Sequence, residues 1–331
     1  MRFRSTFPTP RFRPAWWLPG GQLQTLAGKY MRPETPLPLR RERWETPDGD
    51  FLDVDFGPEL GEDAPLVLLL HGLEGFSERP YMLHAMAVLA GEGLASVGLN
   101  FRGCSGEPNR LPRLYHSGET GDPRFVLEEL RARWPGRSLG ALGFSLGGNV
   151  LLKLLGERDD GGAGLVNASA AISVPYDLSS GVAFLEGSPA GKFYARYFLT
   201  SLKQKLRLKE AMLAPLIDMD AALSSELLSE FDDVATAPLH GFAGAQDYYE
   251  QSSSLQFLEG IRVPTFLVHA KNDPFLPRKS IPSEVMAANP QITPAISRTG
   301  GHVGFITGLI PGRARFWAEG QIAAFLSANL A

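Results

Sequence analysis

Residues 141–150 read ALGFSLGGNV and place one serine, Ser145, between Gly143 and Gly147. The small and apolar residues before the serine are typical of a buried strand. Residues 149–157, NVLLKLLGE, have the pattern of a helix. This G-x-S-x-G pattern predicts a sharp turn from strand to helix, which would hold the serine hydroxyl clear of the sheet. Glycines two residues on either side suit such a turn because bulkier side chains would collide there.

The sequence around this turn alternates between apolar strands and amphipathic helices. We expect strands within residues 64–72, 94–106, 138–145, 167–178, 263–273 and 293–302. Helical spacing marks residues 79–93, 122–136, 147–157 and 313–331. This alternation predicts a mainly parallel sheet covered by helices on both faces. Residues 39–57 instead predict two short strands joined by a Pro-Asp-Gly turn, which would form an antiparallel edge.

The alternation stops at about residue 175 and resumes after about residue 236. The intervening residues have helical patterns without strands, so we interpret residues 175–236 as a helical cap inserted after the sixth strand of the sheet. Residues 41–174 and 237–331 would then form the α/β core. Residues 1–40 are rich in proline, arginine and tryptophan and show little periodicity. We expect them to form an irregular N-terminal arm.

Composition narrows the possible functions. The chain has 331 residues, 44% of them hydrophobic, and a formal net charge of −4, which gives no general attraction for nucleic acid. Its one cysteine, Cys104, excludes an intrachain disulfide and a zinc site made of cysteines. No stretch of about 18 apolar residues predicts a transmembrane helix, and the first residues do not resemble a signal peptide. These features predict a cytoplasmic protein.

A serine hydroxyl becomes a good nucleophile when a base removes its proton. Of the six histidines, His302 is the preferred base because it follows the last predicted strand, and flanking glycines let the chain place its ring over the turn. Asp273, just past a strand, is the preferred acid because the order serine, acid, histidine is typical of this architecture. Asp177 is the alternative acid, and His269 lies inside a predicted strand as a core residue.

Two backbone amides are candidates for stabilising the oxyanion that forms when a serine attacks a carbonyl. The N–H of Leu146, the residue after the serine, would point toward that oxyanion at a helix N-terminus. The loop LLLHGLEGF would supply a second donor, for which we choose the N–H of Leu73. His71 and Gly72 are expected to shape this loop rather than to transfer protons.

Six motifs occur in a fixed order along the chain: HGLEG, NFRGCSGEPNR, YHSGET, GFSLGGN, KNDPF and GGHVGF. With the N-terminal segment WWLPGGQLQTL, they make the chain resemble the YheT-like α/β-hydrolases, whose eukaryotic relatives are the ABHD lipid esterases. The resemblance runs from about residue 14 to the last helix. It implies a serine carboxylesterase or acylglycerol lipase with no metal and no organic cofactor, acting on a small-molecule or lipid ester. The implied catalytic residues are Ser145, Asp273 and His302.

The motif RGCSGEPNR is not explained by the catalytic residues. We expect Arg102, Glu107 and Arg110 to form an ion-pair network under the site, with Cys104 packed beneath it. His116 and Glu119 in YHSGET would likewise brace the site.

The cap contains a long amphipathic segment, residues 191–213, which would pack on the core or act as an apolar lid over an acyl pocket. Its basic residues are interpreted first as a solvated face and second as a contact with anionic lipid headgroups. These basic residues are Lys203, Lys205, Arg207 and Lys209.

Ester hydrolysis is the function that these residues favour. A thioesterase or an amidase with the same three side chains, and a non-catalytic binding protein on the same fold, are the alternatives. Nucleotide binding is not favoured, because the glycine-rich turns match neither G-x-G-x-x-G nor G-x-x-x-x-G-K-[ST].

Overall fold

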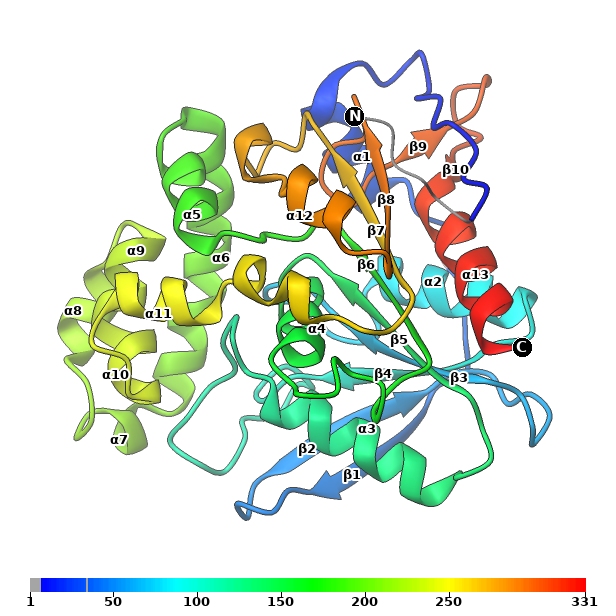
Figure 1. Ribbon diagram of the computed structural model, residues 1–331. Helices are drawn as coiled ribbons and strands as arrows, with labels where there is room; N and C mark the ends of the chain where they lie inside the picture. Colours follow the sequence, from blue (N-terminus) through cyan, green and yellow to red (C-terminus); the bar gives the residue numbers. More distant parts are fainter. Residues whose placement is uncertain (1–6, 34) are drawn as a thin grey trace.

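The computed structural model describes residues 7–33 and 35–331, which fold around one eight-stranded sheet (Figure 1). The strand order is β1-β2-β4-β3-β5-β6-β7-β8. Strands β3 to β8 run parallel, and β1 and β2 form an antiparallel edge, as predicted. The strands are β1 (Arg40–Glu45), β2 (Phe51–Phe56), β3 (Leu66–Leu70), β4 (Ala95–Asn100), β5 (Leu139–Phe144), β6 (Ala168–Ile172), β7 (Thr265–Ala270) and β8 (Ile292–Ser297).

Helices cover both faces of this sheet, as the alternating pattern predicted. In β3, Leu66, Leu68 and Leu70 pack on one face with α3 (Gly121–Arg133), α4 (Leu146–Gly156) and α12 (Ser283–Ala288). Val67 and Leu69 pack on the other face with α2 (Pro80–Gly91) and α13 (Trp317–Leu330). Because every strand residue is buried on one side or the other, the strand is a continuous apolar run.

A helical segment without strands lies between β6 and β7. Figure 1 shows it on the side of the molecule away from α13, and its helices share an apolar cluster of their own. The insertion follows the sixth strand, but helices continue beyond residue 236, so the limits 175–236 stay a prediction. The elements are α5 (Leu178–Glu186), α6 (Pro189–Leu208), α7 (Glu210–Leu213), α8 (Met219–Ser224), α9 (Leu228–Phe231), the π-helix η1 (Asp232–Thr236), α10 (Ala237–His240), α11 (Ala245–Ser252) and the 3₁₀ helix η2 (Ser254–Gly260).

The N-terminal arm is more regular than expected, because it contains the helix α1 (Gly20–Tyr30). Its buried face consists of Gln24, Ala27 and Gly28, so the large apolar residues that mark a helix in a sequence are missing. The amide of Gln24 donates to the carbonyls of Leu18 and Ile306, and its side-chain oxygen accepts from the Ile306 N–H. These bonds tie the arm to the hairpin of β9 (Ile306–Thr307) and β10 (Arg315–Phe316). Residues 1–6 of the arm lie outside the described residues.

One further 3₁₀ helix, η3 (Arg278–Ser280), lies between β7 and α12. Within the described ranges, no helix is both long enough and apolar enough to cross a membrane.

Candidate active site

Ser145 occupies the turn between β5 and α4 in a strained backbone conformation. Its φ is 51° and its ψ is −117°, a region that residues with a side chain rarely adopt. A Cβ on Gly143 would lie 2.5 Å from the carbonyl oxygen of Gly147, and a Cβ on Gly147 would lie 2.4 Å from that of Leu70. Backbone blocks both positions, so the two glycines are a steric requirement of the turn.

The structure brings Ser145, His302 and Asp273 into one chain of hydrogen bonds. Nε2 of His302 lies 2.9 Å from Oγ of Ser145, and Nδ1 lies 2.8 Å from Oδ2 of Asp273. Asp273 is buried, and its other oxygen accepts from the Phe275 N–H at 2.8 Å. The three residues follow β5, β7 and β8, whose carboxyl ends meet at one edge of the parallel sheet.

The alternative acid, Asp177, has a different position and role. It caps the N-terminus of α5, where its carboxylate accepts from the N–H and the hydroxyl of Ser180. The structure therefore provides no contact between Asp177 and His302.

Three backbone hydrogen bonds and one ring hold the loop of His302. The His302 N–H donates to Oγ1 of Thr25 at 2.8 Å, and the Gly301 N–H donates to Oδ1 of Asn272 at 3.1 Å. The Val303 N–H donates to Oγ of Ser173 at 3.0 Å. The Phe275 ring stacks on the imidazole, with 4.2 Å between centroids. Sequence reasoning missed the contribution of Thr25, whose only signal was its place in the segment WWLPGGQLQTL.

The two candidate oxyanion donors flank Ser145. Leu146 is the first residue of α4, where an N–H has no partner within the helix. Leu73 follows β3, and among the described residues its N–H has no hydrogen-bond acceptor. A Cβ on Gly72 would lie 3.3 Å from Cβ of Ser145, so this loop passes directly over the serine. Both leucines line a cavity that also reaches Ser145 and His302.

His71 shapes this loop, as predicted from its position. Its Nε2 accepts from the Phe101 N–H at 3.2 Å, so Nε2 carries no proton and Nδ1 donates to the Gly72 carbonyl at 2.8 Å. Burial lowers the pKa of His71 to about 3, which keeps the ring neutral.

Glu74 connects the Leu73 loop to the helical segment. Its carboxylate accepts from Nζ of Lys205 at 2.8 Å and from the hydroxyl of Ser201, both on α6. Oη of Tyr115 accepts from the Glu74 N–H and donates to Oε1, each at 2.7 Å. Nζ of Lys205 also lies 2.9 Å from Sγ of Cys104. Helix α6 is thus fastened to the residue beside one candidate oxyanion donor.

These contacts correct the interpretation of Lys203, Lys205 and Lys209 as a solvated or headgroup-binding face, whereas Arg207 is exposed as that interpretation expected. Lys205 points inward to Glu74, and Lys209 donates to Oδ1 of Asn109 and to the carbonyls of Leu111 and Arg113. Lys203 donates to the Ser225 carbonyl. Cys104 is buried as expected, and burial raises the pKa of its thiol to about 11.

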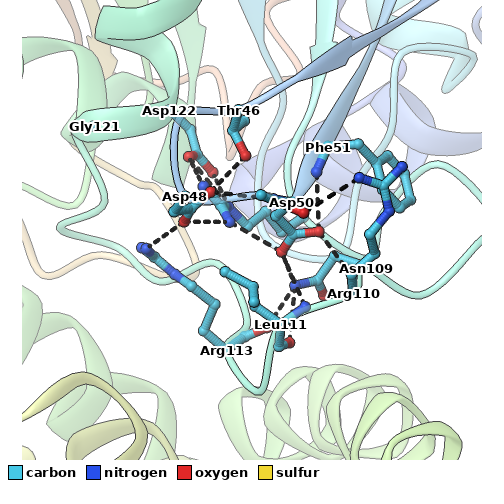
Figure 2. Close-up of polar contacts among 12 residues, drawn as sticks. Thr46, Asp48, Asp50, Phe51, Asn109, Arg110, Leu111, Arg113, Gly121 and Asp122 are labelled. Atoms are coloured by element: carbon cyan, nitrogen blue, oxygen red, sulfur yellow. Dashed lines mark hydrogen bonds and ion pairs between the residues drawn. The ribbon is translucent and has the colours of Figure 1, made fainter.

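The predicted network among Arg102, Glu107 and Arg110 does not form, because each of the three pairs with other residues. Most of these partners lie in the β1–β2 hairpin. Arg102 pairs with Asp48, Asp50 and Asp122, Arg110 with Glu45, and Glu107 with Arg43. Figure 2 shows that Asp50 holds the loop at residues 109–111. Its carboxylate accepts from the side chain of Asn109 and from the backbone N–H groups of Arg110 and Leu111. Sequence spacing cannot reveal such partners about 50 to 60 residues away.

Among the described residues, His302 is the histidine that hydrogen-bonds to the serine hydroxyl. His269 is buried in β7, and neither ring nitrogen has a hydrogen-bond partner in the described part of the chain. The rings of His116 and His240 lie against one another at an angle of 50°, with 4.4 Å between centroids. Glu119 pairs with Arg113 and lies 3.7 Å from Nε2 of His116, and His116 lies in the wall of the cavity that Leu73 and Leu146 line. His84 lies on α2.

Two cavities meet at Ser145 and His302. The first, about 130 Å³, extends into the helical segment and is mainly apolar, with side chains such as Leu178, Val182 and Leu202. Its walls also include Asp232, whose carboxylate accepts from the hydroxyls of Thr236 and Tyr249. Burial raises the pKa of Asp232 to about 6.

The second cavity, about 390 Å³, opens between α1 and α6. Aromatic side chains dominate its walls, and Lys29 and Arg79 supply cations. The aromatic residues are Tyr30, Tyr81, Phe144, Phe193, Tyr194, Tyr197, Phe198 and Phe275. Together the two cavities could accommodate the two sides of a substrate bond held at Ser145. In the described part of the chain, no group of three or more histidine, cysteine or acidic side chains is arranged to hold a metal ion.

Comparisons with known proteins agree with this architecture. A family model described as the alpha/beta hydrolase fold matches residues 65–309. The chain is 36% identical over 312 residues to the YheT protein of Escherichia coli (strain K12), covering 93% of this chain and 90% of YheT. It is 30% identical over 310 residues to phospholipase ABHD3 of Mus musculus, covering 92% of this chain and 75% of that protein. A solved esterase structure from Pyrococcus furiosus superposes with a TM-score of 0.59 at 15% identity, covering 99% of each chain.

Proposed function

The chain belongs to the YheT-like α/β-hydrolases, and we propose that it is a serine carboxylesterase that cleaves acyl esters through an acyl-enzyme. The observation that carries the proposal is the chain of hydrogen bonds from Asp273 through His302 to Ser145, with distances of 2.8 and 2.9 Å. The names of the relatives support hydrolysis as the reaction, and the hydrogen-bond geometry supports Ser145 as the nucleophile and His302 as the base.

In the proposed reaction, Oγ of Ser145 attacks the acyl carbonyl while Nε2 of His302 takes the hydroxyl proton. Asp273 accepts the hydrogen bond from Nδ1–H, which holds the required tautomer and stabilises the positive imidazolium. The N–H groups of Leu73 and Leu146 stabilise the oxyanion. His302 then returns the proton to the leaving alcohol, and water releases the acyl group by the same route.

The two cavities support a lipid ester as substrate, such as an acylglycerol. The acyl chain would enter the mainly apolar cavity within the helical segment, and the alcohol would occupy the aromatic cavity between α1 and α6. A relative of this chain is named a phospholipase, which is consistent with a lipid substrate. Thioesters and amides are the alternative substrates of the same three side chains.

The test combines labelling with turnover. A fluorophosphonate probe should label the parent protein at Ser145, and p-nitrophenyl esters of graded chain length should be hydrolysed. Ser145→Ala should abolish labelling and lower kcat by about 10⁴-fold or more. Ser283→Ala, at an exposed serine of α12, is the matched control and should behave as the parent.

Full activity of Ser145→Ala would remove the assigned nucleophile. A folded parent protein with neither labelling nor turnover would favour the non-catalytic alternative. Comparing an octanoyl ester with the octanoyl thioester and amide separates the remaining classes, since the proposal expects the highest kcat/KM for the ester.

A further inference from the structure

Exposed aromatic side chains and a lysine line the cavity between α1 and α6, and further basic residues adjoin them on α6. We call this surface the cavity rim: Lys29 and Tyr30 of α1 and Phe193 and Tyr197 of α6 line the cavity, and Lys192 and Arg196 directly precede the two α6 aromatics in the helix. The exposed fractions of Tyr30, Phe193 and Tyr197 are 73%, 68% and 47%. Large aromatic side chains with this exposure mark an interaction surface when they lie together.

Contacts between the helices make the cavity rim one continuous surface. Oη of Tyr194 lies 2.6 Å from Oε1 of Gln22, which joins α6 to α1. Nζ of Lys29 lies 4.2 Å from the centroid of the Tyr197 ring, so a cation of one helix rests on an aromatic ring of the other. The cavity behind these residues reaches Ser145 and His302.

The cavity rim is positive in a chain that is negative overall. The formal net charge is −4, with 36 acidic residues, yet residues 7–33 and 187–209 contain no aspartate or glutamate. Lys29, Lys192 and Arg196 are all exposed. Glu74, a carboxylate on the cavity wall, is already paired with Lys205. Lys29 therefore lines the opening, and the exposed Lys192 and Arg196 adjoin its α6 wall, in two segments that contain no acidic residue.

We propose that the cavity rim docks the protein on the surface of an anionic lipid bilayer, with the cavity opening toward the lipid. Aromatic rings suit the interface between headgroups and acyl chains, and lysine and arginine suit anionic headgroups. The same surface surrounds the route to Ser145, so a docked protein would receive a lipid ester directly from the bilayer. That benefit rests on the proposed esterase function, whereas docking itself needs no hydrolysis.

The test measures sedimentation of the Ser145→Ala protein with vesicles, so that no substrate is consumed. Vesicles that mix phosphatidylglycerol with phosphatidylcholine should retain at least about tenfold more protein than pure phosphatidylcholine vesicles. Added salt should reduce this difference, because it screens the headgroup charge. Equal retention on both kinds of vesicle would overturn the proposal.

Two arginines provide a matched pair of charge reversals. Arg196→Glu, in the cavity rim, should lower the partition onto anionic vesicles about tenfold. Arg124→Glu reverses an arginine that is also exposed, on α3 and outside the rim, and should bind as the parent. The aromatic variant Phe193→Ala/Tyr197→Ala should also bind about tenfold less, since it removes apolar surface that enters the interface. Equal binding by Arg196→Glu and Arg124→Glu would place the contact elsewhere.

Two further readouts separate the possible failures. Circular dichroism confirms that each variant is folded before its binding is compared. Light scattering of the parent protein reports dimers, and a dimer that Phe193→Ala/Tyr197→Ala disrupts would assign the cavity rim to a second copy of the chain and overturn bilayer docking. Vesicle binding without ester turnover in the Ser145-containing parent would contradict the proposed function and leave docking intact.

Discussion

Gly147 lies so close to the loop after β3 that a methyl group does not fit. An added Cβ would lie 2.4 Å from the Leu70 carbonyl oxygen and 2.5 Å from that of His71, and neither backbone oxygen can rotate away. Gly147→Ala should therefore lower the free energy of unfolding by about 3 kcal/mol. It should also lower turnover, because the displaced loop carries Leu73. Urea unfolding and p-nitrophenyl ester hydrolysis measure the two effects.

Gly320 provides the control for this prediction. It lies inside α13, and nothing lies within 4 Å of an added Cβ. Gly320→Ala should raise the free energy of unfolding by roughly 0.5–1 kcal/mol, since alanine has less freedom to lose on folding. Equal stability of the two variants would contradict the close approach at Gly147.

At the acid position, the preferred Asp273 and the alternative Asp177 make opposite predictions. Asp273→Asn should lower kcat by about 10⁴-fold, because the amide can donate to Nδ1 of His302 and stabilise the wrong tautomer. Asp177→Asn should retain nearly parental kcat, because asparagine also caps a helix well. The measurement is p-nitrophenyl ester hydrolysis by both variants. The reverse ranking would make Asp177 the acid despite its capping position in this structure.

Among the elements, α6 is joined to the core through a buried ion pair. Nζ of Lys205 lies 2.8 Å from Glu74, whose side chain is 3% exposed. Lys205→Met should lower the free energy of unfolding by about 3–5 kcal/mol, because it leaves a buried carboxylate without its cation. Because Glu74 adjoins Leu73, whose N–H is a candidate oxyanion donor, the variant should lower kcat by a larger factor than it changes KM. Urea unfolding and steady-state kinetics report the two effects.

The double variant Glu74→Gln/Lys205→Met tests whether the unpaired charge causes the loss. It should be more stable than Lys205→Met alone, since it leaves no unpaired charge at this position. Arg207→Met removes an exposed cation from the same helix and should change stability by less than about 0.5 kcal/mol. A double variant no more stable than Lys205→Met would show that packing, and not charge, connects α6 to the loop.

Sequence patterns predicted the elements whose signals are local. The alternation of Leu66, Leu68 and Leu70 with Val67 and Leu69 defines a strand buried on both faces, and that strand is confirmed. The glycine turn and the order of serine, acid and histidine were enough to choose three side chains that the structure joins.

Contacts between distant segments could not be predicted in this way. Thr25 accepts from the His302 N–H although the two residues are 277 positions apart, and Lys205 donates to Glu74, which lies 131 positions away in the sequence. A charge run looks solvated until its partners are known, which is why Lys205 and Lys209 were misread. Helix α1 was missed because its buried face is made of glutamine, alanine and glycine.

For the molecule as a whole, buried titratable groups determine how stability depends on pH. Burial lowers the pKa of His71 to about 3 and that of His269 to about 4, below the ordinary value of 6.5. From pH 6.5 down to about pH 4, the unfolded chain therefore binds more protons than the folded protein at these two positions. The free energy of unfolding should fall as pH falls, by about 1.4 kcal/mol per pH unit for each histidine.

Asp232 acts in the opposite direction. Burial raises its pKa from 3.8 to about 6, so between these values the folded protein binds the extra proton and gains stability as pH falls. The net change from the three groups is one proton taken up on unfolding near pH 5. His116 and His240, whose pKa values burial lowers to about 3, add to the loss at acidic pH. The protein should thus be less stable at pH 5 than at pH 7 in urea unfolding.

His269→Phe tests this account at one position. Neither ring nitrogen of His269 has a hydrogen-bond partner in the described part of the chain, so phenylalanine removes a titrating group without removing a bond. The ring also faces Tyr176, with 5.7 Å between centroids, and an aromatic replacement preserves that contact. The slope of unfolding free energy against pH between pH 5 and 6 should become shallower by about 1.4 kcal/mol per pH unit. An unchanged slope would mean that His269 titrates alike in the folded and unfolded states, and acid sensitivity would then have to come from the other histidines.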